Sequence, residues 1–274
     1  MAAIETPVTI TEPIVTEKNK FAEEFSVTEA VAVKQLKDAL PEILKEALGT
    51  EDAYILWGVP LDKSSDDARI DVILIKFLRA RNMEIPAAKE MLINTLKWRK
   101  EYKTDGILDE EFDTNVFSDN VGFIHGKDKE GRPVTYNFYG GIDQDIVFGD
   151  IDKFIRWRVQ LMERGVQAID FVHTDAMIQV HDYKGASVFG RTQNTKEATN
   201  RLIKLMQDNY PEFLASKLFV NVPRWGSMIF KLLTPLLSPA TLSKFNVSSS
   251  SEVKQTLLTF IDQDQLPPIY AKDL

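Results

Sequence analysis

Residues 176–222 read AMIQVHDYKGASVFGRTQNTKEATNRLIKLMQDNYPEFLASKLFVNV, and this stretch decides the fold class. A strand pattern over 176–183 is followed by helical spacing over 195–209 and by a second strand pattern over 217–222. Two strands that are joined through a helix need a crossover connection, which aligns the strands in parallel. The stretch therefore predicts an α/β domain built on a parallel sheet.

Helix and strand patterns alternate on both sides of this stretch as well. Further helices are predicted over residues 150–169, 223–237 and 251–261, and further strands over 134–139 and 244–247. The N-terminal third shows helical spacing only, over 32–48, 71–81 and 86–102. The first 30 residues keep no period long enough to pack. We therefore expect a mobile tail over residues 1–30, an N-terminal helical segment over 31–105, and an α/β domain over 106–274 whose largely parallel sheet is floored by helices.

The composition excludes several classes of function. Of the 274 residues, 33 are Lys or Arg and 41 are Asp or Glu, so the formal net charge is −8, which argues against a nucleic-acid partner. The sequence contains no cysteine, which excludes disulfides, zinc–thiolate and iron–sulfur sites and cysteine nucleophiles, and favours a reducing compartment. His125, His173 and His181 are too few for a multi-histidine metal centre.

Targeting and catalytic motifs are missing from the sequence. Residues 1–20 have neither a basic n-region nor an apolar h-region, so we do not expect a secretory signal. No apolar run reaches the roughly 20 residues of a spanning helix, so any membrane contact is expected to be peripheral. Motifs of dinucleotide-binding, P-loop, serine-hydrolase and zinc-protease enzymes are absent. The sequence thus favours a binding protein over an enzyme.

The segment over 223–237, PRWGSMIFKLLTPLL, is unusually apolar for a surface helix. Its apolar residues cover more than half of the helix circumference. Two interpretations stay open: a helix buried in the core, or a movable gating helix whose second apolar face meets lipid or a hydrophobic ligand.

Six motifs carry a resemblance to a known family. They are FLRAR at 77–81, KWRKEY at 97–102, DKEGRPV at 128–134, QDNYPE at 207–212, FVNVP at 219–223 and SPATLSK at 238–244. Over residues 33–270 the chain resembles the CRAL-TRIO lipid-binding proteins, the Sec-fourteen-like phosphatidylinositol-transfer family. DKFIRWRVQLMERG at 152–165 and QVHDYKGASV at 179–188 are similar to a fungal branch, the fifth Sec-fourteen homologue, which transfers phosphatidylinositol and also binds haem.

The strand over 177–183 has an unusual polar face. Its pleat places Gln179, His181 and Tyr183 on one side and apolar residues mostly on the other. One interpretation is a hydrogen-bonded network in the core. The other is a ligand site in which Tyr183, as a phenolate, is the axial ligand of ferric haem. His181 lies roughly 7 Å along the strand, so it would be a neighbour on the same side of the iron or a replacement for the tyrosine.

The resemblance implies two sets of site residues. The set for haem b consists of Tyr139, Arg158, His181, Tyr183 and Lys217, with Tyr183 as iron ligand and His181 as a second candidate. The set for the inositol-phosphate head group consists of Arg81, Glu212, Thr241 and Lys244. Two positions depart from the family pattern: Asn82 stands where a lysine is common, and Tyr270 with Ala271 where the family usually has a Tyr/Phe-Gly-Gly turn.

From the resemblance we expect a non-enzymatic phosphatidylinositol-transfer protein that also binds haem b. It is expected in the cytoplasm, with peripheral association to endoplasmic reticulum or microsomal membranes. Two alternatives remain: a haem-binding or haem-sensing protein with little lipid transfer, and a CRAL-TRIO scaffold that recognises partner proteins.

Overall fold

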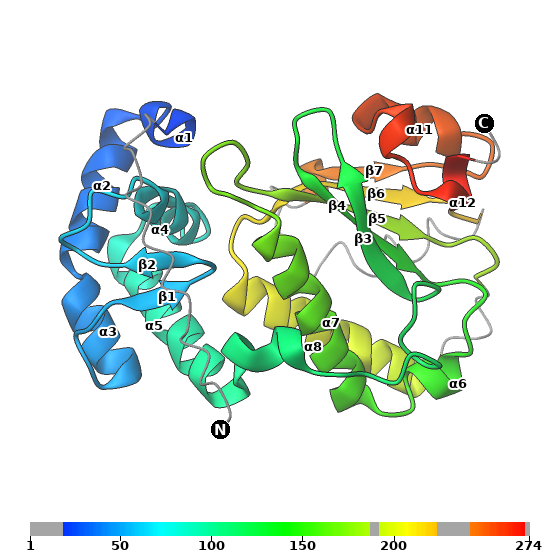
Figure 1. Ribbon diagram of the computed structural model, residues 1–274, viewed down its shortest axis with the longest axis horizontal. Coiled ribbons are helices and arrows are strands. Elements are labelled where there is room, and N and C mark those ends of the chain that lie inside the picture. The colour runs from blue at the N-terminus through cyan, green and yellow to red at the C-terminus, as the bar shows by residue number, and fades with distance from the viewer. Residues whose placement is uncertain (1–18, 187–191, 224–241, 272–274) are drawn as a thin grey trace, which may run out of the picture.

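The computed structural model describes residues 19–186, 192–223 and 242–271. Two units lie side by side in Figure 1: a helical unit formed by the N-terminal third of the chain, and a unit built on a central sheet. In the part of the chain that is described, no helix is both long enough and apolar enough to cross a membrane.

The N-terminal unit consists of five helices and a small hairpin. Its elements are α1 (Lys20–Glu23), α2 (Val27–Asp38), α3 (Leu40–Leu48), β1 (Tyr54–Leu56), β2 (Val59–Leu61), α4 (Arg69–Arg79) and α5 (Ile85–Tyr102). The expectation of a mobile tail over residues 1–30 is wrong from residue 19 onward. The side-chain amide of buried Asn19 donates to the carbonyl oxygen of Phe171 at 2.6 Å, and Ser26 forms a capping box with Glu29 that starts α2.

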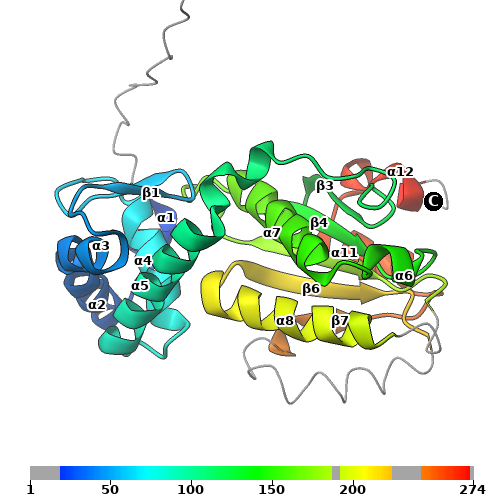
Figure 2. The same cartoon turned by 90° about the horizontal axis from the view of Figure 1, so that it is seen from below.

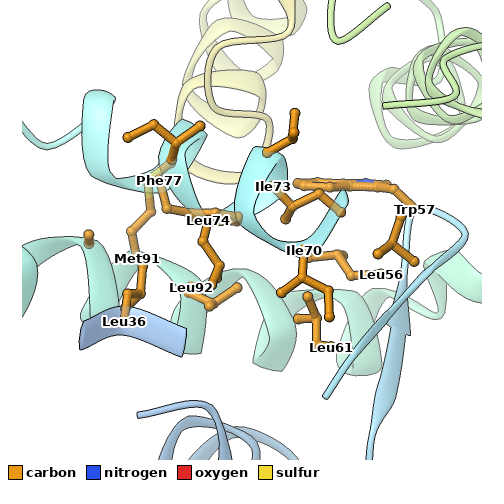
Figure 3. Close-up of a cluster of buried hydrophobic side chains, with 14 of the residues drawn as sticks. Leu36, Leu56, Trp57, Leu61, Ile70, Ile73, Leu74, Phe77, Met91 and Leu92 are labelled. Atoms are coloured by element: carbon orange, nitrogen blue, oxygen red, sulfur yellow. The ribbon is translucent and has the colours of Figure 1, made fainter. Parts of the chain in front are cut away.

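The core of this unit is centred on α4. Figure 3 shows α4 side chains meeting residues of α2, α5 and the hairpin. Ile70, Ile73 and Phe77 are fully buried, and the ring of Trp57 stacks on Phe77 with centroids 6.0 Å apart. Most of the α4 surface is therefore inaccessible to solvent, including that of a lysine, Lys76.

The second unit contains a five-stranded sheet and its covering helices. Its elements are η1 (Thr104–Asp109), β3 (Gly122–Lys127), β4 (Pro133–Phe138), α6 (Gln144–Val147), α7 (Ile151–Gln167), β5 (Met177–Asp182), α8 (Gln193–Asn209), β6 (Leu214–Val220), β7 (Phe245–Val247), α11 (Val253–Phe260), η3 (Gln263–Gln265) and α12 (Pro268–Ala271). The strand order is β3-β4-β5-β6-β7. β3 and β4 pair antiparallel, and every other pair is parallel, which confirms the predicted α/β class and largely parallel sheet.

The two faces of the sheet differ in polarity. One face is apolar and packs on α11; it presents Val134, Tyr136, Ile178, Val180, Leu218 and Val220. The opposite face looks toward α7 and α8, and Figure 2 shows these two helices running along it. His181 lies on this second face, beside Asn137 of β4 and Phe219 of β6 in the register. The pleat predicted for β5 is therefore observed.

The sequence patterns missed three strands and leave one element untested. The strands β1 and β2 have three residues each, and β3 contains two glycines, so none shows a recognisable period. The predicted gating helix over 223–237 lies almost wholly outside the described residues.

Candidate ligand-binding site

A cavity of about 570 Å³ lies between the polar face of the sheet and the helices α7 and α8. This volume is within the range of small-molecule and cofactor sites. The wall formed by α8 is mixed in character and comprises Thr195, Thr199, Leu202, Ile203 and Met206. The wall formed by the sheet contains Thr135, Gln179, His181, Lys217 and Phe219. The polar side chains that alternate along β4 and β5 thus face a cavity and not a packed core.

Three aromatic side chains stack along one wall of the cavity. The ring of Tyr139 lies 5.3 Å from that of His181 and 5.1 Å from that of Tyr183, measured between centroids. Gly140 allows this arrangement, because a Cβ atom there would lie 1.9 Å from the carbonyl oxygen of Lys184. The close approach of the two loops brings the phenol rings together, so a bulkier residue at position 140 would separate them.

His181 is a neutral, buried imidazole. Only 5% of its surface is exposed. Burial lowers its pKa well below the usual value, and the positive charges of Lys217 and Arg158 lower it further. Its Nε2 atom is buried and has no hydrogen-bond partner among the described residues. A buried nitrogen in this state is a candidate to bind a ligand in the cavity.

Two cations also face the cavity from the second unit. Arg158 of α7 donates a hydrogen bond to the side-chain oxygen of Asn137, and the Nζ atom of Lys217 lies 5.6 Å from the ring centroid of Phe219. Burial, together with the charge of Arg158, lowers the pKa of Lys217 to about 7. No carboxylate within the described ranges forms an ion pair with either cation. The arrangement suits an anionic group on a bound molecule.

A second charged cluster lines the same cavity at the side of the N-terminal unit. Glu212 and Lys244 form an ion pair with an O–N distance of 3.0 Å, and both side chains are only partly exposed. Arg81, two residues beyond the end of α4, also lines the cavity, and its guanidinium donates to the carbonyl oxygen of Ala80 at 2.9 Å. The fourth predicted head-group residue, Thr241, lies outside the described residues.

The structure therefore brings the described members of both predicted sets together on one cavity. The predicted residues that line it are Arg81, Tyr139, Arg158, His181, Tyr183, Glu212, Lys217 and Lys244. Asn137, which holds Arg158, was not predicted, although its place between Thr135 and Tyr139 on an alternating strand was a usable signal. The residue pattern alone, without the family resemblance, would place Arg158 and Lys217 among the surface charges. In the structure both side chains line the cavity.

Other features of the described residues carry less chemistry. A second hollow, of about 590 Å³, lies beside α7 and α8 and contains none of the predicted site residues. Its charged side chains form ion pairs with one another, as Arg156 does with Glu110 and Arg201 with Asp152. Across the described ranges, no three His, Asp or Glu side chains gather as a metal site.

Comparisons with known proteins match both units of the chain. Residues 117–270 match the CRAL/TRIO domain, and residues 32–94 match the CRAL/TRIO N-terminal domain. The chain is 36% identical over 263 residues to Patellin-6 of Arabidopsis thaliana, covering 93% of this chain and 61% of the patellin. It is 35% identical over 267 residues to the phosphatidylinositol transfer protein SFH5 of Meyerozyma guilliermondii, covering 89% of this chain and 77% of that protein.

A solved structure also matches. The crystal structure of Sfh5 has a TM-score of 0.74 and 31% sequence identity, and the match covers 84% of this chain and 83% of that one. The chain spans between 38% and 61% of the length of the six Arabidopsis patellins that it matches.

Proposed function

The chain belongs to the CRAL/TRIO family, and on that premise we propose that it carries phosphatidylinositol between membranes inside the cavity described above. The proposal draws on the name of its SFH5 relative, a phosphatidylinositol transfer protein. It includes transient, peripheral contact with a membrane surface, and we place that surface at the endoplasmic reticulum or microsomal membranes.

The observation that carries this proposal is a charged cluster at one side of a cavity that also contains apolar surface. Arg81, Glu212 and Lys244 line the cavity on the side of the N-terminal unit, and Leu202, Ile203 and Met206 of α8 add apolar surface beside the polar side chains of the sheet. Phosphatidylinositol has the same division, because an anionic phosphate and an inositol ring are joined to two acyl chains. The cations suit the phosphate, and the carboxylate of Glu212 accepts hydrogen bonds from hydroxyl groups.

Transfer of this kind needs no covalent step. The apolar walls shield acyl chains from water, which is worth about 25 cal/mol for each Å² of apolar surface removed from water. Glu212 and Lys244 neutralise each other through their ion pair. A bound head group would compete with this contact, offering phosphate oxygens to Lys244 and hydroxyl groups to Glu212.

The experiment is a transfer assay between vesicles with Lys244→Ala. Loss of a charge-assisted hydrogen bond removes about 1.5–3 kcal/mol, so phosphatidylinositol transfer is expected to fall roughly 10- to 150-fold. Any phosphatidylcholine transfer should change little. Lys254→Ala is the matched control, because exposed Lys254 lies on α11 across the sheet from the cavity. Equal loss for both lipids, or equal loss in the control, would mean that Lys244 does not recognise the head group.

Haem b is a second candidate ligand of the same cavity. The residues present fit it on three observations: the unpartnered Nε2 of His181, the stacked phenols of Tyr139 and Tyr183, and the cations Arg158 and Lys217. Tyr183 would hold the iron, with His181 as the alternative ligand. Arg158 and Lys217 would pair with the haem carboxylates, and Tyr139 would pack against the ring. When bound, haem would supply an iron centre able to change oxidation state.

The visible spectrum of the haem-loaded protein tests this second candidate. Tyr183→Phe keeps the ring and deletes the oxygen, so haem should be lost or its spectrum shifted toward histidine ligation through His181. Tyr139→Phe is the control, since it removes a neighbouring phenol oxygen from the same wall. Arg158→Ala should weaken haem retention without changing the type of spectrum. An unaltered spectrum in Tyr183→Phe would exclude tyrosine ligation.

A further inference from the structure

Lys76 is a buried cation that none of the predicted sets includes. It lies on α4 in the N-terminal unit, and only 1% of its surface is exposed. Its Nζ atom contacts two residues of the second unit. It lies 3.0 Å from Oδ2 of Asp175 and donates to the main-chain carbonyl oxygen of Glu212 at 3.1 Å. A lysine is rarely buried to this degree without a partner, and here the partners come from the second unit.

The carbonyl that Lys76 holds belongs to a residue with an unusual backbone. Glu212 has φ of +52°, in the left-handed region that residues other than glycine seldom occupy. Such a conformation persists only where the surroundings enforce it. The contact from Lys76 restrains the orientation of the peptide group that follows Glu212. The direction of the Glu212 side chain depends on the same backbone angles, and its carboxylate pairs with Lys244 on the cavity wall.

The helix that carries Lys76 also delivers a second head-group residue. Arg81 follows the end of α4 by two residues and lines the cavity. The side chain of Lys76 therefore connects the element that places Arg81 to the backbone that places Glu212.

We infer that Lys76 is a positioning residue of the lipid head-group site, which sets the carboxylate of Glu212 relative to Arg81 through its contact with the Glu212 carbonyl. The effect of Lys76 on lipid transfer rests on the proposed function, whereas its contacts with Asp175 and Glu212 do not. Asp175 has a supporting role: it neutralises Lys76, while its own side chain is 27% exposed and does not line the cavity.

Two variants separate positioning from general stability. Lys76→Met removes both contacts and keeps an unbranched apolar stem. Asp175→Asn removes the charge of the ion pair but keeps an oxygen that can accept from Lys76, so the contact with Glu212 survives. Lys76→Leu, which also lacks a donor, replaces Lys76→Met if the latter does not fold.

Two measurements are made on each folded variant: the backbone carbon chemical shifts of Glu212 without lipid, and the initial rate of phosphatidylinositol transfer between vesicles. In Lys76→Met we expect the shifts to leave left-handed values and the rate to fall about tenfold, which corresponds to about 1.4 kcal/mol. Asp175→Asn should keep the left-handed shifts and stay within about twofold of the wild-type rate.

The inference is overturned if Lys76→Met keeps the left-handed shifts of Glu212, or if Asp175→Asn loses transfer to the same extent. The chemical shifts are measured without lipid, so they separate the two claims. A wild-type protein that transfers no phosphatidylinositol, with Glu212 shifts that still move in Lys76→Met, would remove the proposed function and leave the positioning role intact.

Discussion

Lys217 shows how the cavity changes the chemistry of a single residue. Its pKa falls from 10.5 to about 7 because the amine is enclosed and Arg158 is close. The unfolded chain therefore binds one more proton than the folded protein between about pH 7 and 10.5. This group therefore costs no stability above about pH 10.5; the cost grows as the pH falls from 10.5 to about 7 and is complete below about pH 7.

This sign leads to a prediction for Lys217→Met in the ligand-free protein. The variant should be more stable than the wild type at pH 7, because it no longer encloses a charge. Its advantage should shrink as the pH rises toward 10, by up to about 1.4 kcal/mol per pH unit. Urea unfolding at several pH values measures the difference. A difference that stays constant with pH, as expected for the exposed control Lys254→Met, would contradict the pKa assignment.

The sequence pattern alone predicted part of the cavity wall. The pleat of β5 predicted that Gln179, His181 and Tyr183 share a face, since successive side chains of a strand alternate. The burial of Lys76 had no such signal. In a helical sequence a lysine among apolar residues indicates the exposed side, and only the contacts with Asp175 and Glu212 reverse that expectation.

At the scale of elements, the two units are joined by buried ion pairs. Arg99 of α5 and Glu163 of α7 form a salt bridge of 2.6 Å in which both side chains are at least 92% buried. Tyr210, just after α8, donates to the same carboxylate. The charge of Glu163 helps to hold the Arg99 guanidinium protonated by raising its pKa.

Removal of one partner from this pair should destabilise the protein strongly. Arg99→Met leaves the Glu163 carboxylate buried with only Tyr210 as a donor among the described residues. We expect the free energy of unfolding to fall by about 3–5 kcal/mol. Tyr210→Phe, which deletes one hydrogen bond to a charged group, should cost about 1.5–3 kcal/mol. Both are measured by urea unfolding; a loss below about 1 kcal/mol in Arg99→Met would mean that the pair does not hold α5 on α7.

Some elements could be predicted and others could not, for physical reasons. Long amphipathic helices such as α5 and α7 carry many turns of periodic burial, so their patterns are clear. The hairpin β1–β2 is held by its contacts with the helical core, and its three-residue strands are too short for a period. The start of α2 was missed although its signal was present, because Ser26 and Glu29 have the spacing of a capping box.

At the scale of the whole molecule, one cavity collects residues that are far apart in the sequence. Arg81 comes from the N-terminal unit, Glu212 from the loop before β6 and Lys244 from the residue before β7. No local pattern predicts this convergence, because it depends on the crossover connections of the sheet and on the docking of α4. The family resemblance predicted which residues belong to the head-group site. The fold then brings the side chains of Glu212 and Lys244 to within 3.0 Å of each other.

Native mass spectrometry after incubation with mixed phosphatidylinositol and phosphatidylcholine vesicles tests the central claim most directly. The account predicts a complex of one chain with one phosphatidylinositol molecule, formed in preference to the phosphatidylcholine complex and lost preferentially in Lys244→Ala. A haem adduct has a different mass and would be observed separately in the same spectrum. A wild-type protein that carries no phospholipid, or that takes up both lipids equally, would contradict the claim that this cavity is a phosphatidylinositol site.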